Sequence, residues 1–310
     1  MKQYILGIGT ANIDVYGKSV SKIKTHYDQP AEIYTSVGGV TRNILTNYTK
    51  LGGQAKMMSA TGNDVYSEVI LNDLKKNNID TKNIICSKKY SSSTFMQIQD
   101  SDNDMYLALC DMSAMKEITN KYLNDRKDII LKSKLVIFDP SLEERVIKTL
   151  ISICRNKVPI FVDPISDNYA LKLKPYVNEF SCIKPNKSEL EYLSGIKIKN
   201  ENDVCRACES LIKQGTNEIY VSLGREGILY MNKQGEKIRS RFKNKYKAVN
   251  ASGAGDAAMA SIIYGYTHNL TKEKTIDYAL AAGIATIKVK EAVNEDLSIN
   301  LLNKIIKENS

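Results

Sequence analysis

The stretch "NASGAGDAAMA" (residues 250–260) combines two glycines, several small residues and one carboxylate, and an apolar helical pattern follows it. The backbone N–H groups of Gly253, Ala254 and Gly255 would lie at a helix N-terminus, where the helix dipole stabilises anions. Such donors suit the charge that develops on a phosphoryl group in transfer. Asp256 has the wrong charge to hold a phosphate, but it could accept the proton of an attacking hydroxyl. The alternative is an aspartate that only stabilises a helix start, by about 0.5–1 kcal/mol.

Asn12 and Asp14 form a second polar group, near the N-terminus. They alternate on an extended segment, so both side chains point the same way and could bind adjacent hydroxyls of a sugar. The alternative is a turn in which each side chain caps its own backbone. A glycine fingerprint of the dinucleotide-binding type fails, because Asn12 stands where the third glycine would be needed.

The stretch "SVGGVTRN" places Gly38 and Gly39 before a helix whose first turn carries Arg42 and Asn43. Two glycines allow close approach of the backbone to a ligand and allow hinge motion. Asn43 would then reach a ligand from the start of the helix. The alternative is a plain helix start with glycine at the cap.

In "KPNKSELEYL", Asn186 and Glu189 are three residues apart at a helix start and therefore share one face. This pattern suits either a capping box or a Mg²⁺ site reached through water, since magnesium keeps several waters and takes few carboxylates. The stretch "SLGREG" supplies Ser222, Gly224 and Gly227 after a strand. Contacts to nucleotide phosphates and a tight hairpin turn are equally good readings of it.

Apolar runs of strand length alternate with helical patterns, which is typical of an α/β domain with a parallel sheet covered on both faces. Polar or glycine-bearing turns follow most of the strands, and ligands bind beyond the carboxyl ends of such strands. Residues 15–37 and 84–111 break the alternation, and we expect them to form a small antiparallel sheet that acts as a lid. One domain, residues 1–310, accounts for the rest. Expected strands are 4–9, 55–62, 134–139, 158–163, 180–185 and 218–224 with a hairpin at 227–242, and expected helices are 41–53, 65–79, 142–156, 187–194, 203–214, 254–267 and 272–289.

Bulk properties exclude several classes of protein. No stretch approaches the roughly 18–20 apolar residues that span a bilayer, and the N-terminus predicts a first strand, so we expect a cytoplasmic protein with no membrane partner. The net charge of +9 comes from lysines spread along the chain, and no basic stripe indicates nucleic-acid binding. Cys205 and Cys208 form a CxxC without a second pair on a helical pattern, which favours core packing over metal or redox chemistry.

Four of these motifs, "GGVTRN", "KPNKSE", "SLGREG" and "NASGAGDAAMA", together resemble the ribokinase, or PfkB, family of carbohydrate kinases. The resemblance spans nearly the whole chain in the same order. It implies a three-layer α/β/α core with a β-sheet lid, ATP and Mg²⁺ as cosubstrates, and phosphorylation of a hydroxymethyl group. By the same resemblance Asp256 is the catalytic base and the small residues before it form the anion hole. The sugar-binding positions are Asp14, Gly39 and Asn43, the magnesium-associated pair is Asn186 with Glu189, and Asp139 in "FDP" matches a lid-side residue that touches sugar in some members.

Two departures from the ribokinase pattern narrow the resemblance. Asn250 and Ala251 stand where ribokinases carry Asp-Thr, and that aspartate contributes to a potassium site in many members, so the resemblance leaves activation by a monovalent cation open here. Val40 stands where ribokinases carry a lysine. Both departures resemble the pseudouridine kinase branch, as do "DMYLALCDM" and "AVNEDLS", and imply phosphorylation of the ribose 5′-hydroxyl of a C-nucleoside. Another sugar or nucleoside kinase, of the ribose, fructose or adenosine type, and a non-catalytic ligand-binding member are the alternatives. A lid sheet with an exposed edge also favours a homodimer.

Overall fold

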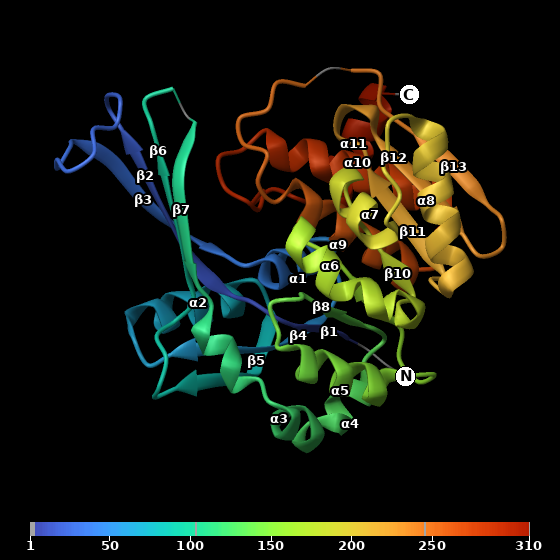
Figure 1. Ribbon diagram of the computed structural model, residues 1–310, viewed down its shortest axis with the longest axis horizontal. Coiled ribbons are helices and arrows are strands. Elements are labelled where there is room, and N and C mark those ends of the chain that lie inside the picture. Colours follow the sequence, from blue (N-terminus) through green and yellow to red (C-terminus); the bar gives the residue numbers. More distant parts are fainter. Residues whose placement is uncertain (1–3, 103, 245, 310) are drawn as a thin grey trace.

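A computed structural model describes residues 4–102, 104–244 and 246–309 of the chain. Its main sheet contains β1 (Ile5–Ile8), β4 (Ala55–Gly62), β5 (Ile79–Ser87), β8 (Val136–Phe138), β9 (Ile160–Val162), β10 (Cys182–Ile183), β11 (Glu218–Ser222), β12 (Ile228–Asn232) and β13 (Lys237–Ser240). The strand order is β13-β12-β11-β10-β9-β8-β1-β4-β5 (Figure 1). Neighbours from β11 to β5 are parallel, and β12 and β13 extend the sheet antiparallel. The predicted mostly parallel sheet is therefore confirmed.

Helices cover both faces of this sheet, and each face has its own hydrophobic core. One face packs against α1 (Val40–Lys50), α2 (Val65–Lys76), α9 (Ala254–Thr267) and α10 (Lys272–Ile287). The other packs against α3 (Asn120–Asp125), α4 (Lys127–Lys132), α5 (Glu144–Cys154), α6 (Asp167–Leu173), α7 (Lys187–Ser194) and α8 (Glu201–Gln214). The last helix, α11 (Ile299–Asn309), packs on α10 in a smaller cluster. This confirms the three-layer α/β/α core.

The central strand β1 shows why the sequence folds into these layers. Leu6 and Ile8 lie in one core and Ile5 lies in the other, because successive side chains of a strand point to opposite faces. All three side chains are fully buried, which is why the strand is a continuous apolar run. At Gly7 a Cβ would lie 2.6 Å from the side chain of Leu45, so the missing side chain lets α1 approach the sheet. The start of α1 is thereby held next to the carboxyl end of β1.

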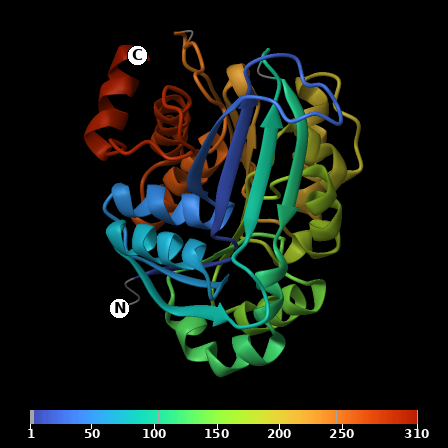
Figure 2. The same cartoon turned by 90° about the vertical axis from the view of Figure 1, so that its left-hand side faces the viewer.

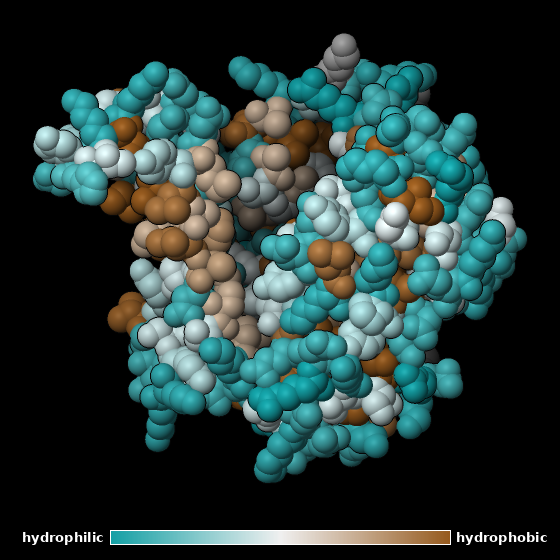
Figure 3. All heavy atoms as spheres, viewed as in Figure 1, coloured by the Kyte–Doolittle hydropathy of each residue, from teal (hydrophilic) through white to brown (hydrophobic). Residues whose placement is uncertain are grey.

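A second, four-stranded sheet stands away from the core (Figures 1 and 2). It consists of β2 (Asn12–Ser19), β3 (Ala31–Gly38), β6 (Thr94–Gln99) and β7 (Met105–Asp111), in the order β3-β2-β6-β7. The surface is hollowed between this sheet and the body of the molecule (Figure 3). The sheet joins the core through short links, since β2 begins four residues after β1 ends and β3 ends two residues before α1 begins.

The structure corrects two details of the expected small sheet. Residues 84–87 lie in β5 of the main sheet, where Ile84 pairs with Ser59 and Ser87 pairs with Gly62. The small sheet is also not purely antiparallel, because β2 and β6 run parallel. The reason is that the chain passes through α1, β4, α2 and β5 of the core between β3 and β6. A connection of that length can return a strand in either direction.

Several elements differ from the sequence-based expectation. The helices α3, α4, α6 and α11 were not predicted, and β5 was divided between an expected helix and the expected lid. Cys205 and Cys208 are buried on α8 in the core beneath it, as the packing interpretation of the CxxC requires. Among the described residues, no helix has both the length and the apolar character needed to cross a bilayer.

Candidate active site

The start of α9 has the geometry of an anion site. Gly253 precedes the helix with φ of 77°, and a Cβ there would lie 1.8 Å from the backbone oxygen of Ala292. Both the left-handed backbone and the contact require glycine. The first intrahelical bond is donated by Ala257 N–H to the Gly253 carbonyl, at 2.9 Å. The N–H groups of residues 254–256 have no acceptor within the helix and face outward, as at every helix N-terminus.

Asp256 lies in this first turn and is 9% exposed. Its Oδ2 accepts a hydrogen bond of 2.8 Å from the Nδ2 of Asn43 on α1. Burial raises the pKa of Asp256 to about 7, and the nearby carboxylate of Asp163 acts in the same direction, against the smaller opposing effects of Asn43 and Lys184. A carboxyl group with a pKa near neutrality is suited to accept a proton.

A chain of contacts fixes the amide of Asn43. Arg42 donates from Nη1 to the Asn43 Oδ1 at 3.0 Å, so the Nδ2 of Asn43 faces Asp256. Asp73 on α2 accepts from the guanidinium of Arg42 at Nε (2.8 Å) and at Nη2 (2.5 Å). Gly39, the residue immediately before α1, has φ of 101°, and a Cβ there would lie 2.5 Å from the backbone oxygen of Thr10. The double glycine thus lets the start of α1 touch the loop after β1.

Asn12 and Asp14 lie at the base of the four-stranded sheet and are brought together. The Nδ2 of Asn12 donates to Asp14 Oδ1 at 2.6 Å, and Asn12 pairs with Gly38 across the β2–β3 ladder. A Cβ on Gly38 would lie 2.2 Å from the Asp14 carboxylate, so glycine makes room for it. Burial raises the pKa of Asp14, although Asn12, Tyr16 and Arg42 partly offset the rise.

Asp139 has a different environment from the one that the resemblance implied. It follows β8 of the main sheet, is 1% exposed, and does not belong to the four-stranded sheet. Its Oδ2 accepts from the N–H and Oγ1 of Thr10 and from Thr41 Oγ1, at 2.6, 3.0 and 2.8 Å. Its Oδ1 accepts from the N–H and hydroxyl of Ser141. Both oxygens therefore accept from the chain's own donors and hold the β1–β2 loop in place, while contact of Asp139 with a sugar stays a prediction.

An ion pair that the motifs did not reveal lies between the strand ends. Asp163 follows β9 and Lys184 follows β10, and their Oδ2 and Nζ atoms are 2.9 Å apart. They are 6% and 4% exposed. Burial alone lowers the pKa of Lys184, but Asp163, Glu189 and Asp256 together outweigh it and the net change in pKa is upward. The signal in the sequence was a charged residue directly before proline after each of two apolar runs, "VDP" and "IKP".

Asn186 and Glu189 form the capping box at the start of α7. Asn186 Oδ1 accepts from Glu189 N–H at 2.9 Å, and Glu189 Oε2 accepts from Asn186 N–H at 2.8 Å. Glu189 is only 4% exposed, and burial together with Asp163 raises its pKa to about 7. Two neighbouring buried carboxylates are a donor set that suits a hard cation such as Mg²⁺. The capping role is therefore present, and the residues also fit a metal held through water.

The residues of "SLGREG" form the turn between β11 and β12. Ser222 lies beside Asn186 through a parallel bridge and donates its N–H to the Pro185 carbonyl at 2.9 Å. Gly224 and Gly227 have φ of 59° and 84°, and a Cβ on Gly227 would lie 2.1 Å from the Ser240 backbone oxygen. The tight-turn reading is thus present, while contact of these residues with a nucleotide stays a prediction.

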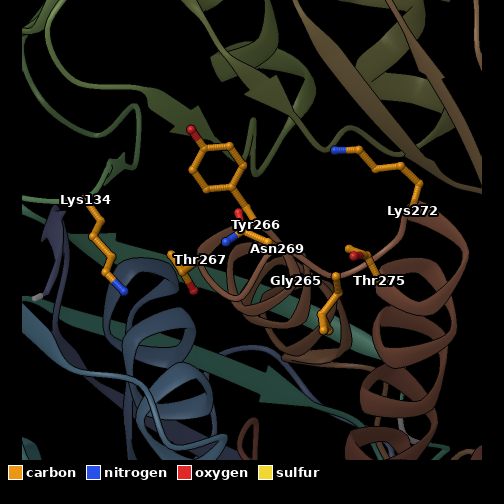
Figure 4. A pocket seen from close by; sticks show the side chains of 8 residues that line it. Lys134, Gly265, Tyr266, Thr267, Asn269, Lys272 and Thr275 are labelled. Atoms are coloured by element: carbon orange, nitrogen blue, oxygen red, sulfur yellow. The ribbon is translucent and has the colours of Figure 1, made fainter. Parts of the chain in front are cut away.

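A cavity of about 560 Å³ lies at the opposite end of the sheet (Figure 4). It is lined by Lys134, which precedes β8, and by residues of the α9–α10 turn, including Tyr266 and Lys272. Lys272 is already paired with Glu218 at 2.5 Å. None of the residues predicted to do chemistry lines this cavity. The candidate active site is instead the group of strand ends and helix starts around Asp256.

Comparison with known proteins identifies the family to which the chain belongs. The pfkB family carbohydrate kinase model matches residues 2–299. The chain belongs to the pfkB family of carbohydrate kinases. It is 30% identical to the pseudouridine kinase of Escherichia coli (strain K12) over 298 residues, which cover 96% of this chain and 95% of that protein.

Solved structures of family members have the same fold. A putative sugar kinase from Clostridium perfringens superposes with a TM-score of 0.89 at 25% identity, covering 99% of this chain and 96% of that one. A putative ribokinase II from Escherichia coli in complex with ATP and Mg²⁺ superposes with a TM-score of 0.84 at 17% identity, covering 99% of both chains. Membership of the family makes this protein a phosphotransferase that acts on a sugar or nucleoside.

Proposed function

We propose that this pfkB-family kinase transfers the γ-phosphoryl group of ATP to the 5′-hydroxyl of pseudouridine. The observation that carries the reaction is Asp256, a nearly buried carboxylate in the first turn of α9, beside N–H groups that have no acceptor in the helix. The acceptor rests on the similarity to the pseudouridine kinase of Escherichia coli, together with Asn250, Ala251 and Val40, which depart from the ribokinase pattern.

Asp256 accepts the proton of the 5′-hydroxyl as the oxygen attacks phosphorus. The bond between that oxygen and phosphorus forms, the bond from phosphorus to the ADP oxygen breaks, and the proton ends on the Asp256 carboxylate. A base with a pKa of about 7 can take this proton and release it again near neutral pH. The N–H groups of Gly253, Ala254 and Gly255 stabilise the charge on the phosphoryl oxygens. Charge stabilisation of this kind contributes most in a site that excludes water.

The ribose is held at the junction of the two sheets. In this proposal Asn12 and Asp14 bind its hydroxyls, and Gly38 and Gly39 let the sugar lie close to the backbone. Asn43 binds from the start of α1 while it holds Asp256. The hollow in Figure 3 leaves the nucleoside base between the four-stranded sheet and the body of the molecule.

ATP approaches from the other side of Asp256. Its adenosine lies over the turn of Ser222, Gly224 and Gly227, and its phosphates point to the start of α9. Asn186 and Glu189 would hold Mg²⁺ through water, and the ion would supply neutralisation of phosphate charge. The local reason to expect a cation is that Glu189 and Asp163 are two buried carboxylates, whose negative charges a positive ion would offset.

A panel of acceptors tests the assignment. Initial rates of ADP release with ATP and Mg²⁺ are compared for pseudouridine, uridine, ribose, adenosine and fructose. Uridine is the matched control, because it differs from pseudouridine only in the atom that joins base to ribose. Pseudouridine is expected to give the highest kcat/KM. A higher value for any other acceptor would replace it as the substrate, and no turnover with any acceptor would favour a non-catalytic ligand-binding role.

Two further expectations belong with this proposal. The protein acts in the cytoplasm, where ATP is available, and its four-stranded sheet pairs with that of a second copy. Apolar side chains on this sheet are largely exposed, with Ile33 at 71%, Met105 at 63% and Leu109 at 58%. Exposed apolar groups of this kind favour association. Sedimentation should give twice the chain mass of 34.7 kDa, and Leu109→Lys should return the mass to that of one chain.

A further inference from the structure

The buried ion pair of Asp163 and Lys184 has no evident role in holding the fold. Its two partners are 6% and 4% exposed and lie at the ends of adjacent strands. Replacing a buried ion pair by apolar residues of similar size is often neutral or stabilising, so such a pair is weak evidence for a structural role. Parallel sheets bind ligands at the carboxyl ends of their strands, so a buried lysine at this edge favours a ligand-binding role.

The ammonium group of Lys184 lies beside the first turn of α9. A Cβ placed on Gly255 would be 3.4 Å from Lys184 Nζ. Gly255 is one of the residues whose backbone N–H groups face the anion site, and it immediately precedes Asp256. The ammonium and the helix N-terminus therefore approach the same point from two elements that are distant in sequence.

The ammonium group of Lys184 has N–H donors available for a ligand. An ammonium group carries three N–H donors. In the part of the chain that the structure describes, Asp163 is the acceptor within hydrogen-bond distance of Nζ. Two donors are left for a ligand at the start of α9. Gly255 has no side chain, so nothing from that residue stands between the ammonium and the helix start.

The negative charges around Lys184 also favour a positively charged group at this point. Asp163, Glu189 and Asp256 all interact electrostatically with Lys184. Three carboxylates would repel a triphosphate from the place where the transfer must occur. One protein cation set among them reduces that repulsion, independently of any metal.

We propose that Lys184 donates a hydrogen bond to a non-bridging oxygen of the phosphoryl group in transfer, and that Asp163 holds the lysine in the position to do so. Lys184, the first residue of the motif "KPNKSE", is thus a catalytic residue to which the sequence analysis gave no role, and Asp163 is its positioning residue. The proposal rests on the kinase activity of the family and not on which sugar or nucleoside is the acceptor.

Lys184→Met removes the ammonium group and keeps most of the side-chain volume. We expect kcat to fall by about 10²–10³, as when one donor to a developing oxyanion is lost. The KM of the acceptor should change less than about twofold. Without turnover, calorimetry should show unchanged affinity for ADP and a weaker affinity for the β,γ-imido analogue of ATP, because only the analogue carries a γ-phosphoryl group. These binding measurements test the contact even before the acceptor is known.

Two variants separate this role from a structural one. Asp163→Asn with Lys184→Met removes both buried charges, so it should regain the thermal stability that Lys184→Met loses while kcat stays low. Lys184→Arg keeps the charge and should retain part of the activity. Lys272→Met is the matched control, since it breaks the Lys272–Glu218 pair at the far end of the sheet and should leave kcat and KM unchanged.

The proposal is overturned if the double variant recovers kcat along with stability. It is equally overturned if Lys184→Met weakens ADP and the triphosphate analogue to the same extent, because the lysine would then act on the fold of the site rather than on the γ-phosphoryl group.

Discussion

The ionised side chain of Asp256 lowers the free energy of unfolding at neutral pH. Replacing Asp256 with asparagine is expected to raise that free energy again. The folded pKa of about 7 lies above the value of 3.8 for an unfolded chain, because burial and Asp163 disfavour the charged form. Below about pH 3.8 the carboxyl is protonated in both states and there is no penalty. As pH rises, the unfolded chain ionises first, so the free energy of unfolding falls until the folded carboxyl also ionises near pH 7.

The magnitude follows from the difference in pKa. About three pKa units at about 1.4 kcal/mol each give a penalty of about 4 kcal/mol above pH 7. At pH 5 the penalty is about 1.7 kcal/mol by the same relation. Asparagine does not ionise, and its Oδ1 can still accept the hydrogen bond from Asn43. The charged groups that face Asp256, namely Asp163, Lys184 and Asp139, are unchanged in the variant.

The assay is thermal unfolding of Asp256→Asn and of the unsubstituted protein without ligands, between pH 5 and pH 8. A chain of 310 residues has an unfolding entropy near 0.65 kcal/mol/K, so the variant should gain about 6 °C in Tm at pH 8 and about 2.5 °C at pH 5. Its kcat should fall by about 10²–10⁴, the usual contribution of a general base. Asp102→Asn, at an exposed residue of the β6–β7 turn, is the control and should change neither quantity. A gain in Tm that does not depend on pH, or a loss at pH 8, would refute the reasoning.

Three further substitutions probe the same site. Asn43→Ala removes the donor that lowers the pKa of Asp256, so the midpoint of the rise of kcat with pH should move upward in a pH–rate profile. Gly253→Ala forces a Cβ into a backbone oxygen at φ of 77° and should lower both Tm and kcat, whereas Gly52→Ala, at φ of 97° with nothing within 4 Å, should lower Tm by a smaller amount and leave kcat as it is. Arg42→Met leaves the carboxylate of Asp73 without its cationic partner and should destabilise the protein by about 3–5 kcal/mol in urea unfolding, because both side chains are mostly buried.

The layers of the fold could be predicted from the sequence because burial of the sheet on both faces requires a clear pattern of hydrophobic residues. Strands such as β1 and β8 lie in continuous apolar runs, and long amphipathic helices such as α5 and α8 repeat at helical spacing. Most of the elements that were missed lack such a pattern, and the amphipathic helix α11 is the exception. The helices α3, α4 and α6 have only six or seven residues, too few for a clear period. The nine residues of β5 are mostly half-buried, so it looked partly like the end of a helix and partly like a lid.

The site was predictable where one short stretch carries both the backbone and the chemistry. The glycines before α9 and the carboxylate after them are adjacent in sequence, and the same is true of the capping pair of α7. The ion pair of Asp163 and Lys184 joins residues on two different strands, and it depends on which strands are neighbours in the sheet. The hydrogen bonds of Asp139 were unpredictable for the same reason, since its partners Thr10 and Thr41 come from elsewhere in the chain.

The hydrogen bond between Asn43 and Asp256 joins residues 213 positions apart. During synthesis, the first helix of the chain is therefore complete long before the residue that completes the base is added. In the mechanism proposed above, in which Asp256 is the base, a nascent chain that ends before residue 256 cannot transfer phosphate, however well its sheet has formed. Docking of α9 on α1 buries core residues and assembles the reacting group in the same step. Turnover therefore requires that the last fifth of the chain has docked on the core. In a folding experiment, the time at which activity appears then measures when this docking occurs.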